Sequence, residues 1–304
     1  MQTNEYHEIN HYNDLSFPVE LYRGNQFGTI PFGRGLRDFH WHEEMQFTLA
    51  LNTDVTIQVE GKFYFLKPGQ ALFINSGRIH AVTKLSSKGE YVSLNFSPKL
   101  LTFFPGSRME KNFVLPYSIG GSPAVLLLDP QDSSCCQALD ILHHLNQIWL
   151  NKSIADHQYF IAVQIVTLWN ILLPLLSEQK ESTASSNLIY QKRLQQMISF
   201  IYENFSEEIS LQSIADSAHI SIGECCRIFR THLQTTPHHF LTEYRIRKSV
   251  ELLSGTQSIS EIAGYCGYNQ VSNYISKFKR IIGCTPFQYR RQFKSSRSPE
   301  IANN

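Results

Sequence analysis

Two stretches of the chain, ISLQSIADSA at residues 209–218 and QSISEIAGYC at residues 257–266, repeat one pattern about 48 residues apart. In each stretch four apolar residues are spaced i, i+3, i+4 and i+7, which places them on one face of a short helix. They are Leu211, Ile214, Ala215 and Ala218 in the first copy and Ile259, Ile262, Ala263 and Cys266 in the second. Ser210 and Ser258 stand at the N-cap positions, and Ser258 has Glu261 at the spacing of a capping box. The repeat predicts two copies of one small helical unit.

A tight turn and a second helix are predicted to follow each short helix. The turns begin with His219 and Gly267, two residue types that tolerate a left-handed backbone. The inner faces of the second helices are expected to hold Cys225, Ile228 and Phe229 in the first copy and Tyr274, Ile275 and Phe278 in the second. Each copy then reaches a Thr-Pro pair, at residues 236–237 and 285–286. Because a helix-turn-helix places its second helix in the DNA major groove, the sequence predicts two recognition helices.

The segment from about Leu194 to Arg291 resembles the DNA-binding domain of the AraC/XylS family of transcription regulators. Its most specific block is GCTPFQYR at residues 283–290. The other matches are Ile214–Ala215, Arg227 with Phe229–Arg230, Thr236–Pro237, Tyr244–Arg245, Leu252–Leu253, Ile259 with Ile262–Ala263, Gly267–Tyr268 and Phe278–Lys279. The resemblance implies seven helices, with a connecting helix at about residues 241–254 that places the recognition helices in successive major grooves. It also implies double-stranded promoter DNA and RNA polymerase as partners, and activation as the usual outcome, although repression stays open.

The resemblance also assigns groove-facing positions on both recognition helices. They are Gly223, Glu224, Cys226 and Arg227 on the first and Val271, Ser272, Asn273 and Ser276 on the second. We expect Arg227 to donate two hydrogen bonds to guanine, Glu224 to accept one from cytosine, and Asn273 to pair with adenine. A phosphate contact or an internal salt bridge stays open for Arg227. Since the family often has arginine where Ser276 stands, and an amide near Val271, the second helix is expected to depend more on DNA shape.

Basic residues near these helices are candidates for phosphate contacts, which supply salt-dependent affinity. They are Arg230, Lys277, Lys279, Arg280, Arg290 and Arg291. Residues 189–304 hold 14 Lys and Arg against 9 Asp and Glu, whereas residues 1–188 hold 13 against 17, which suggests two different tasks on one chain. The adjacent Cys225 and Cys226 suggest a redox sensor, but a buried structural role is favoured because Cys225 falls on the inner face.

Residues from about 17 to 96 have the alternation and turn signals of short strands. Residues 55–59 alternate apolar and polar, turns are expected at residues 60–62 and 67–70, and strands at residues 63–66, 71–74 and 91–96. Such spacing is typical of a sandwich or barrel. The fold class expected for the whole chain is multidomain α+β, with an N-terminal β-barrel and following helices, and a C-terminal all-α double helix-turn-helix domain.

Three histidines give this region a second resemblance. His40-Trp-His42, the Pro-Gly pair at residues 68–69, and Gly77 three residues before His80 resemble the two motifs of the cupin barrel. In cupin enzymes two His, a Glu and a third His hold a metal. Here Gln46 stands at the glutamate position and is a poor ligand, so we expect neither a metal nor another cofactor, and no enzymatic activity.

The barrel is instead expected to bind a small-molecule effector, with sugars a frequent choice among similar regulators. The predicted effector residues are Arg37, His40, Trp41, His42, Phe47, Phe73 and His80. Two alternatives stay open: a metal-dependent cupin enzyme fused to a DNA-binding domain, and a constitutive DNA-binding protein whose barrel is structural. Bound metal, or the absence of any ligand-dependent change, would distinguish them.

The expected domains are a cupin-like barrel at residues 14–130, a helical segment at 131–176, a linker at 177–188 and the DNA-binding domain at 189–294. In the helical segment, Leu139, Leu142 and Leu145 share one face, Asp156 is a candidate cap for a second helix to about Leu173, and part of the surface is expected to form a homodimer. The stretch from Phe160 to Leu176 is interrupted by polar residues and Pro174 and is expected to fall short of a membrane span. Without a signal-peptide pattern or a C-x-x-C motif, a cytoplasmic location is expected.

Overall fold

The computed structural model describes residues 16–26, 28–30, 36–86, 88–118, 123–150, 154–179, 184–253 and 255–296. Two compact units divide the chain, Met1–Gln195 and Gln196–Asn304. The expected domain bounds stay predictions. Some of the expected domains include residues 14–15, 180–183 and 254, which lie outside the described residues.

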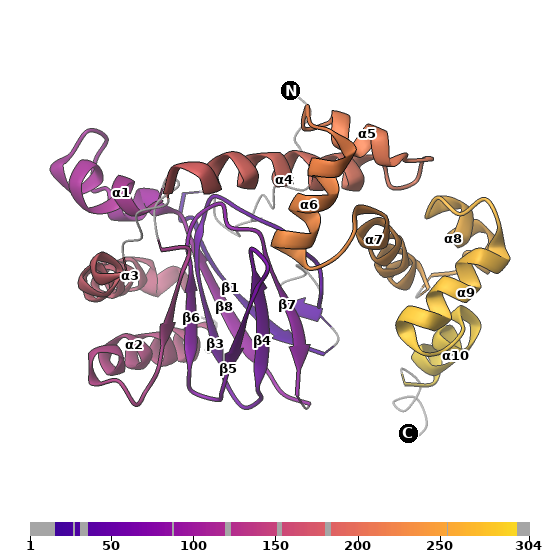
Figure 1. The fold of residues 1–304 in the computed structure, drawn as a ribbon. Helices are drawn as coiled ribbons and strands as arrows, with labels where there is room; N and C mark the ends of the chain where they lie inside the picture. Colours follow the sequence, from indigo (N-terminus) through magenta and orange to yellow (C-terminus); the bar gives the residue numbers. More distant parts are fainter. Residues whose placement is uncertain are drawn as a thin grey trace, which may run out of the picture. The chain divides into compact units, whose positions relative to one another are not determined.

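The described residues of the first unit form two antiparallel sheets (Figure 1). The larger has the strand order β2-β1-β8-β3-β6-β9 and the smaller the order β5-β4-β7. The strands are β1 (Val19–Asn25), β2 (Gly28–Ile30), β3 (Met45–Ala50), β4 (Val55–Val59), β5 (Lys62–Leu66), β6 (Ala71–Ile74), β7 (His80–Leu85), β8 (Tyr91–Phe96) and β9 (Val125–Leu128). The strands predicted at residues 55–59, 63–66, 71–74 and 91–96 are confirmed.

The predicted closed barrel is not confirmed, because the described strands remain in two separate sheets. Strand β7 pairs with β4 along its length, whereas it meets the segment before β3 through an isolated bridge between His80 and His40 and a hydrogen bond from the Arg37 amide to the Val82 carbonyl at 2.7 Å. The sheets nevertheless pack face to face, since one buried apolar cluster contains Ile57 and Val82 of the smaller sheet with Leu72 and Ile74 of the larger.

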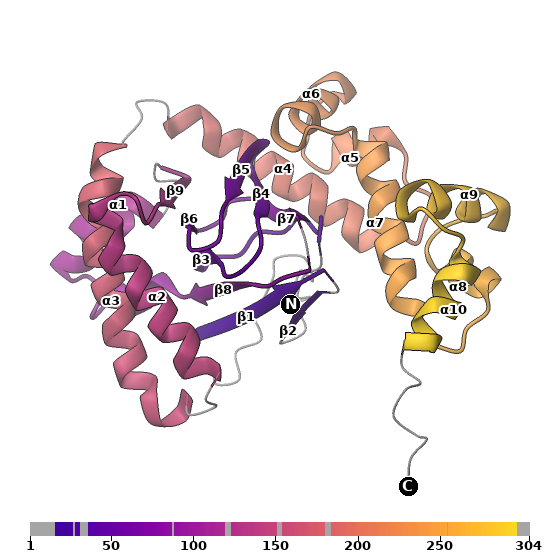
Figure 2. The ribbon, with the colours of Figure 1, turned by 90° about the horizontal axis from the view of Figure 1, so that it is seen from below.

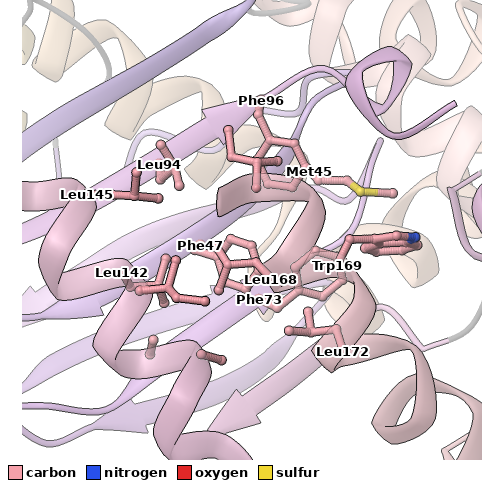
Figure 3. Packing of buried hydrophobic residues seen from close by; sticks show 14 of the residues in the cluster. Met45, Phe47, Phe73, Leu94, Phe96, Leu142, Leu145, Leu168, Trp169 and Leu172 are labelled. Atoms are coloured by element: carbon pink, nitrogen blue, oxygen red, sulfur yellow. The ribbon is translucent and has the colours of Figure 1, made fainter. Parts of the chain in front are cut away.

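Helices α2 (Ser133–Leu150) and α3 (Ile154–Glu178) cover the other face of the larger sheet (Figure 2). Phe47 of β3 packs on Phe73 of β6 with ring centroids 5.2 Å apart, and Phe73 meets Trp169 of α3 at 6.1 Å (Figure 3). Leu142 of α2 and Leu172 of α3 are buried in the same cluster. Burial of each such side chain stabilises the fold by about 1.5–3 kcal/mol, which explains why the helices stay on this face.

Helix α3 is longer than predicted. It continues to Glu178 through Pro174, and Asp156 lies in its first turn rather than at its cap. The segment Asp156–Glu178 contains an 18-residue window with a mean hydropathy of 1.9, so by length and composition alone it is long and apolar enough to cross a membrane, contrary to the expectation from the sequence. A core helix of a globular domain passes the same test, and one face of α3, including Ile161, Ile165 and Leu168, is buried in the first unit.

Three short helical elements lie between β8 and β9 in the chain. They are η1 (Pro98–Leu101), η2 (Glu110–Val114) and α1 (Leu115–Ser118). The indole nitrogen of Trp169 donates a hydrogen bond to the Phe113 carbonyl at 3.0 Å, which attaches this region to α3.

The described part of residues 184–296 forms seven helices, as the resemblance implied. They are α4 (Ala184–Asn204), α5 (Leu211–Asp216), α6 (Ile222–Leu233), α7 (Pro237–Leu252), α8 (Ile259–Tyr265), α9 (Val271–Ile282) and α10 (Pro286–Ser296). Helix α4 passes through the expected end of the linker at residue 188 and continues from the first unit into the second. The predicted connecting helix is α7, which begins earlier, because Thr236 caps it and Pro237 suits its first position.

Both predicted helical hairpins are confirmed. Ser210 and Ser258 are N-caps with complete capping boxes, the second with Glu261. His219 and Gly267, in the turns, have φ angles of 53° and 75°. Ala215 and Ala263 are fully buried, so that each pair of helices crosses closely.

Substitution of Gly267 by alanine should destabilise the second unit. The new Cβ would lie 2.5 Å from the Phe205 carbonyl oxygen, at a φ angle that alanine rarely adopts. We expect a loss of more than about 1 kcal/mol in the free energy of unfolding, measured in urea. The matched control is Gly264→Ala in α8, where nothing lies within 4 Å of the new Cβ, and a gain of roughly 0.5–1 kcal/mol is expected there. Equal effects of the two substitutions would contradict this account of the turn.

Candidate nucleic-acid interface and histidine cluster

The recognition helix α6 has one buried and one exposed face. Cys225, Ile228 and Phe229 are buried, and the Phe229 ring meets Phe240 of α7 edge-on at 5.6 Å. The predicted groove-facing and phosphate-contacting residues lie away from this core. Gly223, Arg227 and Arg230 are exposed, and Glu224 and Cys226 are half-buried.

The recognition helix α9 has the same arrangement. Tyr274 and Phe278 are fully buried with ring centroids 5.7 Å apart, whereas Ile275, expected beside them, is only half-buried. The predicted DNA-facing residues lie on the solvent side: Ser272, Asn273, Ser276, Lys279 and Arg280 are exposed, and Val271 is half-buried. A residue must be exposed to solvent in the free protein if it is to contact DNA, and these residues meet that requirement. Their contacts with bases stay predictions.

Glu224 and Arg227 form a two-point ion pair on α6. The Nε and Nη2 atoms of Arg227 donate to the two carboxylate oxygens of Glu224 at 2.8 and 2.7 Å. An exposed pair of this kind contributes about 1 kcal/mol at most. A two-point contact of arginine with guanine discriminates by about 1–3 kcal/mol, so the pair does not prevent Arg227 from turning to a base.

Arg245 of α7 has a structural role that the sequence did not reveal. Its Nε donates to the Phe205 carbonyl at 2.7 Å and its Nη2 to the Glu207 carbonyl at 2.6 Å, while the guanidinium lies 5.6 Å from the centre of the Tyr268 ring. Burial lowers the pKa of this guanidinium. The side chain ties the segment before α5 to the second hairpin. The only signal in the sequence was its place in the matching Tyr244–Arg245 pair.

The three motif histidines of the first unit lie together. One ring nitrogen of each of His40, His42 and His80 lies within 4.8 Å of the others. His42 and His80 are almost fully buried, and His40 is half-buried. Burial lowers the pKa of His80 well below its usual value, and the neighbouring His40 and His42 lower it further. His80 is therefore neutral at physiological pH.

Gln46 of β3 joins this cluster. Its Oε1 lies 3.1 Å from His42 Nε2 and 3.2 Å from His80 Nε2, and its Nε2 donates to Thr48 Oγ1 at 2.7 Å. We define the histidine cluster as His40, His42, His80 and Gln46.

The other predicted effector residues are placed differently. Phe47 and Phe73 face α2 and α3 in the apolar core, because neighbouring residues of a strand point to opposite faces and Gln46 faces the histidines. Arg37 is exposed and donates from Nε to the Thr83 carbonyl at 3.3 Å, and Trp41 is buried. The effector site stays a prediction, with His40, His42 and His80 together and Phe47 and Phe73 in the apolar core.

The geometry of the second unit defines a class of protein. Two helix-turn-helix units with exposed recognition helices on a compact helical domain are the architecture of a DNA-binding transcription regulator.

The comparisons with known proteins lead to a family. Residues 214–292 match a protein-family model that is described as a helix-turn-helix domain. The uncharacterised HTH-type transcriptional regulator YdeC of Bacillus subtilis is 30% identical over 93% of this chain and 95% of its own length. The HTH-type transcriptional activator RhaR of Mannheimia succiniciproducens is 23% identical over 94% of this chain and 91% of its own. A solved AraC-type regulator of Chromobacterium violaceum is 27% identical, with a TM-score of 0.33, over 36% of this chain and 96% of its own. The chain belongs to the AraC family of transcription regulators.

The cysteines should differ sharply in reactivity. Burial raises the pKa of Cys225 and of Cys266 to about 12, so that almost no thiolate exists at pH 8, whereas Cys136 is exposed. We expect iodoacetamide at pH 8 to alkylate Cys136 rapidly, and Cys225 and Cys266 only after unfolding, as measured by mass spectrometry. Rapid alkylation of Cys225 in the folded protein would instead support the redox-sensor alternative.

Proposed function

We propose that this regulator binds specific promoter sequences through both recognition helices and activates transcription in response to an effector bound by its first unit. The observation that carries the proposal is the pair of exposed recognition helices, with Arg227 on one and Asn273 on the other. Arg227 and Glu224 would read bases from α6, and Asn273 and Ser276 from α9. Arg230, Lys279 and Arg280 would contact phosphates and set the salt dependence.

Activation is supported by the RhaR relative, which is named as a transcriptional activator. It would involve contact with RNA polymerase. The effector would be a small molecule, a sugar being one candidate. It would act by changing the occupancy of promoter half-sites. The relatives are transcription regulators, which favours this function over a metal-dependent enzyme fused to a DNA-binding domain. The same relatives support a cytoplasmic location.

Self-association through α2 and α3 is part of the proposal. These helices bury one face against the sheet and still expose apolar residues on the other. Tyr159 is 86% exposed and Leu150 58% exposed, and Val163 lies one turn after Tyr159. A dimer formed through this surface would bind two promoter half-sites at the same time.

Substitutions on the recognition helices should separate sequence preference from general affinity. We expect Arg227→Ala and Asn273→Ala each to lose about 1–3 kcal/mol of discrimination between a promoter fragment from beside the gene and a neutral fragment. Arg230→Ala should weaken binding to both fragments and lower the salt slope by about 1. The measurement is a salt titration of binding.

Lys62→Ala is the matched control, because Lys62 is an exposed lysine on β5 of the first unit and its loss removes the same charge. The control should bind as wild type does. Binding of the wild type that is no stronger to the promoter fragment than to the neutral one would refute the proposed sequence-specific function.

A further inference from the structure

The hydrogen bonds of the histidine cluster determine which ring nitrogens carry hydrogen. The Nδ1 atoms of His40, His42 and His80 lie 2.8, 3.0 and 2.8 Å from the backbone carbonyl oxygens of Asp38, Glu44 and Arg78. A carbonyl oxygen only accepts hydrogen bonds, so each Nδ1 carries the hydrogen. In a neutral imidazole the Nε2 atom is then left with a lone pair.

The side-chain oxygen of Gln46 adds a fourth lone pair beside the three Nε2 atoms. Its Oε1 is within hydrogen-bonding distance of Nε2 of both His42 and His80, although none of these three atoms has a hydrogen to donate when the rings are neutral. Rotation of the amide would offer its N–H groups to two of the nitrogens, whereas a cation would engage all three rings and the amide oxygen.

The cluster has the construction of a transition-metal site. Histidines that bind a metal through one nitrogen usually donate the other N–H to a carbonyl or carboxylate, as all three do here. The Glu44 carboxylate also lies 3.6 Å from His42 Nδ1. Nitrogens around a tetrahedral ion at about 2.0–2.1 Å are roughly 3.4 Å apart, so ligand atoms now within 4.8 Å of one another need move in by less than about 1 Å each.

The backbone holds two of the ligands in a fixed relation. The amide of His40 donates to the His80 carbonyl at 3.0 Å, and the amide of His80 donates to the His40 carbonyl at 2.9 Å. A reciprocal pair of this kind reduces the conformational entropy lost when the rings close on an ion.

We propose that the histidine cluster binds one divalent first-row transition-metal ion, such as Zn²⁺, Co²⁺ or Fe²⁺, and that this ion, in place of a sugar or other organic molecule, is the effector of the regulator. The proposal reverses the expectation from the sequence that Gln46 excludes a metal, because the structure brings the three histidines together. Three imidazoles with one amide oxygen select such ions over Mg²⁺ and Ca²⁺, which prefer all-oxygen sites. The regulatory half of the inference rests on the proposed function, whereas the metal site stands independently of it.

Gly77 connects the cluster to helix α4. Its amide donates to the His42 carbonyl at 2.8 Å, and its carbonyl accepts from the side-chain amides of Gln191, and of Gln195 at 2.9 Å. Gly77 also stands three residues before His80 in the loop that leads into β7. Movement of His42 and His80 toward an ion would therefore alter the hydrogen bonds that hold the first half of α4, the helix that continues into the DNA-binding unit.

Titration of the chelator-stripped full chain with Co²⁺ tests the site. We expect one equivalent to bind and give visible absorption bands, Zn²⁺ to displace it, and Mg²⁺ to have no effect. His80→Ala should weaken binding by more than the roughly 10–100-fold that loss of an outer-shell partner costs. Gln46→Glu should strengthen it, because a carboxylate replaces the amide oxygen, and this variant preserves the test if His80→Ala fails to fold.

His143→Ala is the matched control, since it removes an exposed histidine of α2 outside the cluster, and it should bind Co²⁺ as wild type does. Absence of Co²⁺ binding to wild type, or unchanged binding in both cluster variants, would overturn the metal site.

Affinity for the promoter fragment, with and without Zn²⁺, tests the coupling. We expect Zn²⁺ to change the wild-type affinity by roughly 5- to 150-fold, the usual range of coupling between two sites. In the Gln191→Ala, Gln195→Ala double variant one equivalent of Zn²⁺ should still bind, but the change in DNA affinity should be much smaller. If Zn²⁺ binds and leaves the wild-type affinity for DNA unchanged, the effector role is overturned. Absence of DNA binding under both conditions would instead contradict the proposed function and leave the metal site intact.

Discussion

The DNA-binding unit depends on one constraint: in each hairpin the short first helix must pack closely against the recognition helix that follows it. Ala215 and Ala263 lie fully buried where the helices of each hairpin meet, and the turns at His219 and Gly267 require a left-handed backbone. Because the inner face of each second helix is buried in this crossing, its outer face is left for solvent and for DNA. Both hairpins have the same N-cap serine, buried alanine and left-handed turn. This repeat is the physical reason why the chain has two equivalent recognition helices.

Strand β3 imposes a comparable division on the first unit. Successive side chains of a strand point to opposite faces, so Phe47 enters the apolar core beneath α2 and α3 while Gln46 faces the histidines. One strand therefore stabilises the unit and supplies a polar group to the candidate metal site. A substitution in the core would for this reason also disturb the position of Gln46.

Prediction from sequence was most successful where the signal is local. The caps at Ser210 and Ser258, the turn residues, and the strands at residues 55–59 and 71–74 depend on neighbours within a few positions. The closed barrel was not confirmed and the end of α3 was misplaced, because strand pairing and the continuation of a helix through Pro174 are decided by distant packing. Arg245 escaped prediction because its partners are backbone carbonyls about 40 residues away.

The sequence by itself determined the two helix-turn-helix units, the family and the convergence of His40, His42 and His80, because periodicity, capping and motif spacing are written in short stretches. Only the tertiary structure decided which partner each ring nitrogen has, that Phe47 and Phe73 belong to the core, and that Gly77 is bonded to Gln191 and Gln195 of α4. Those features join residues more than 100 positions apart or depend on the direction of single side chains. No local pattern records either kind of information, since both follow from how the whole unit packs.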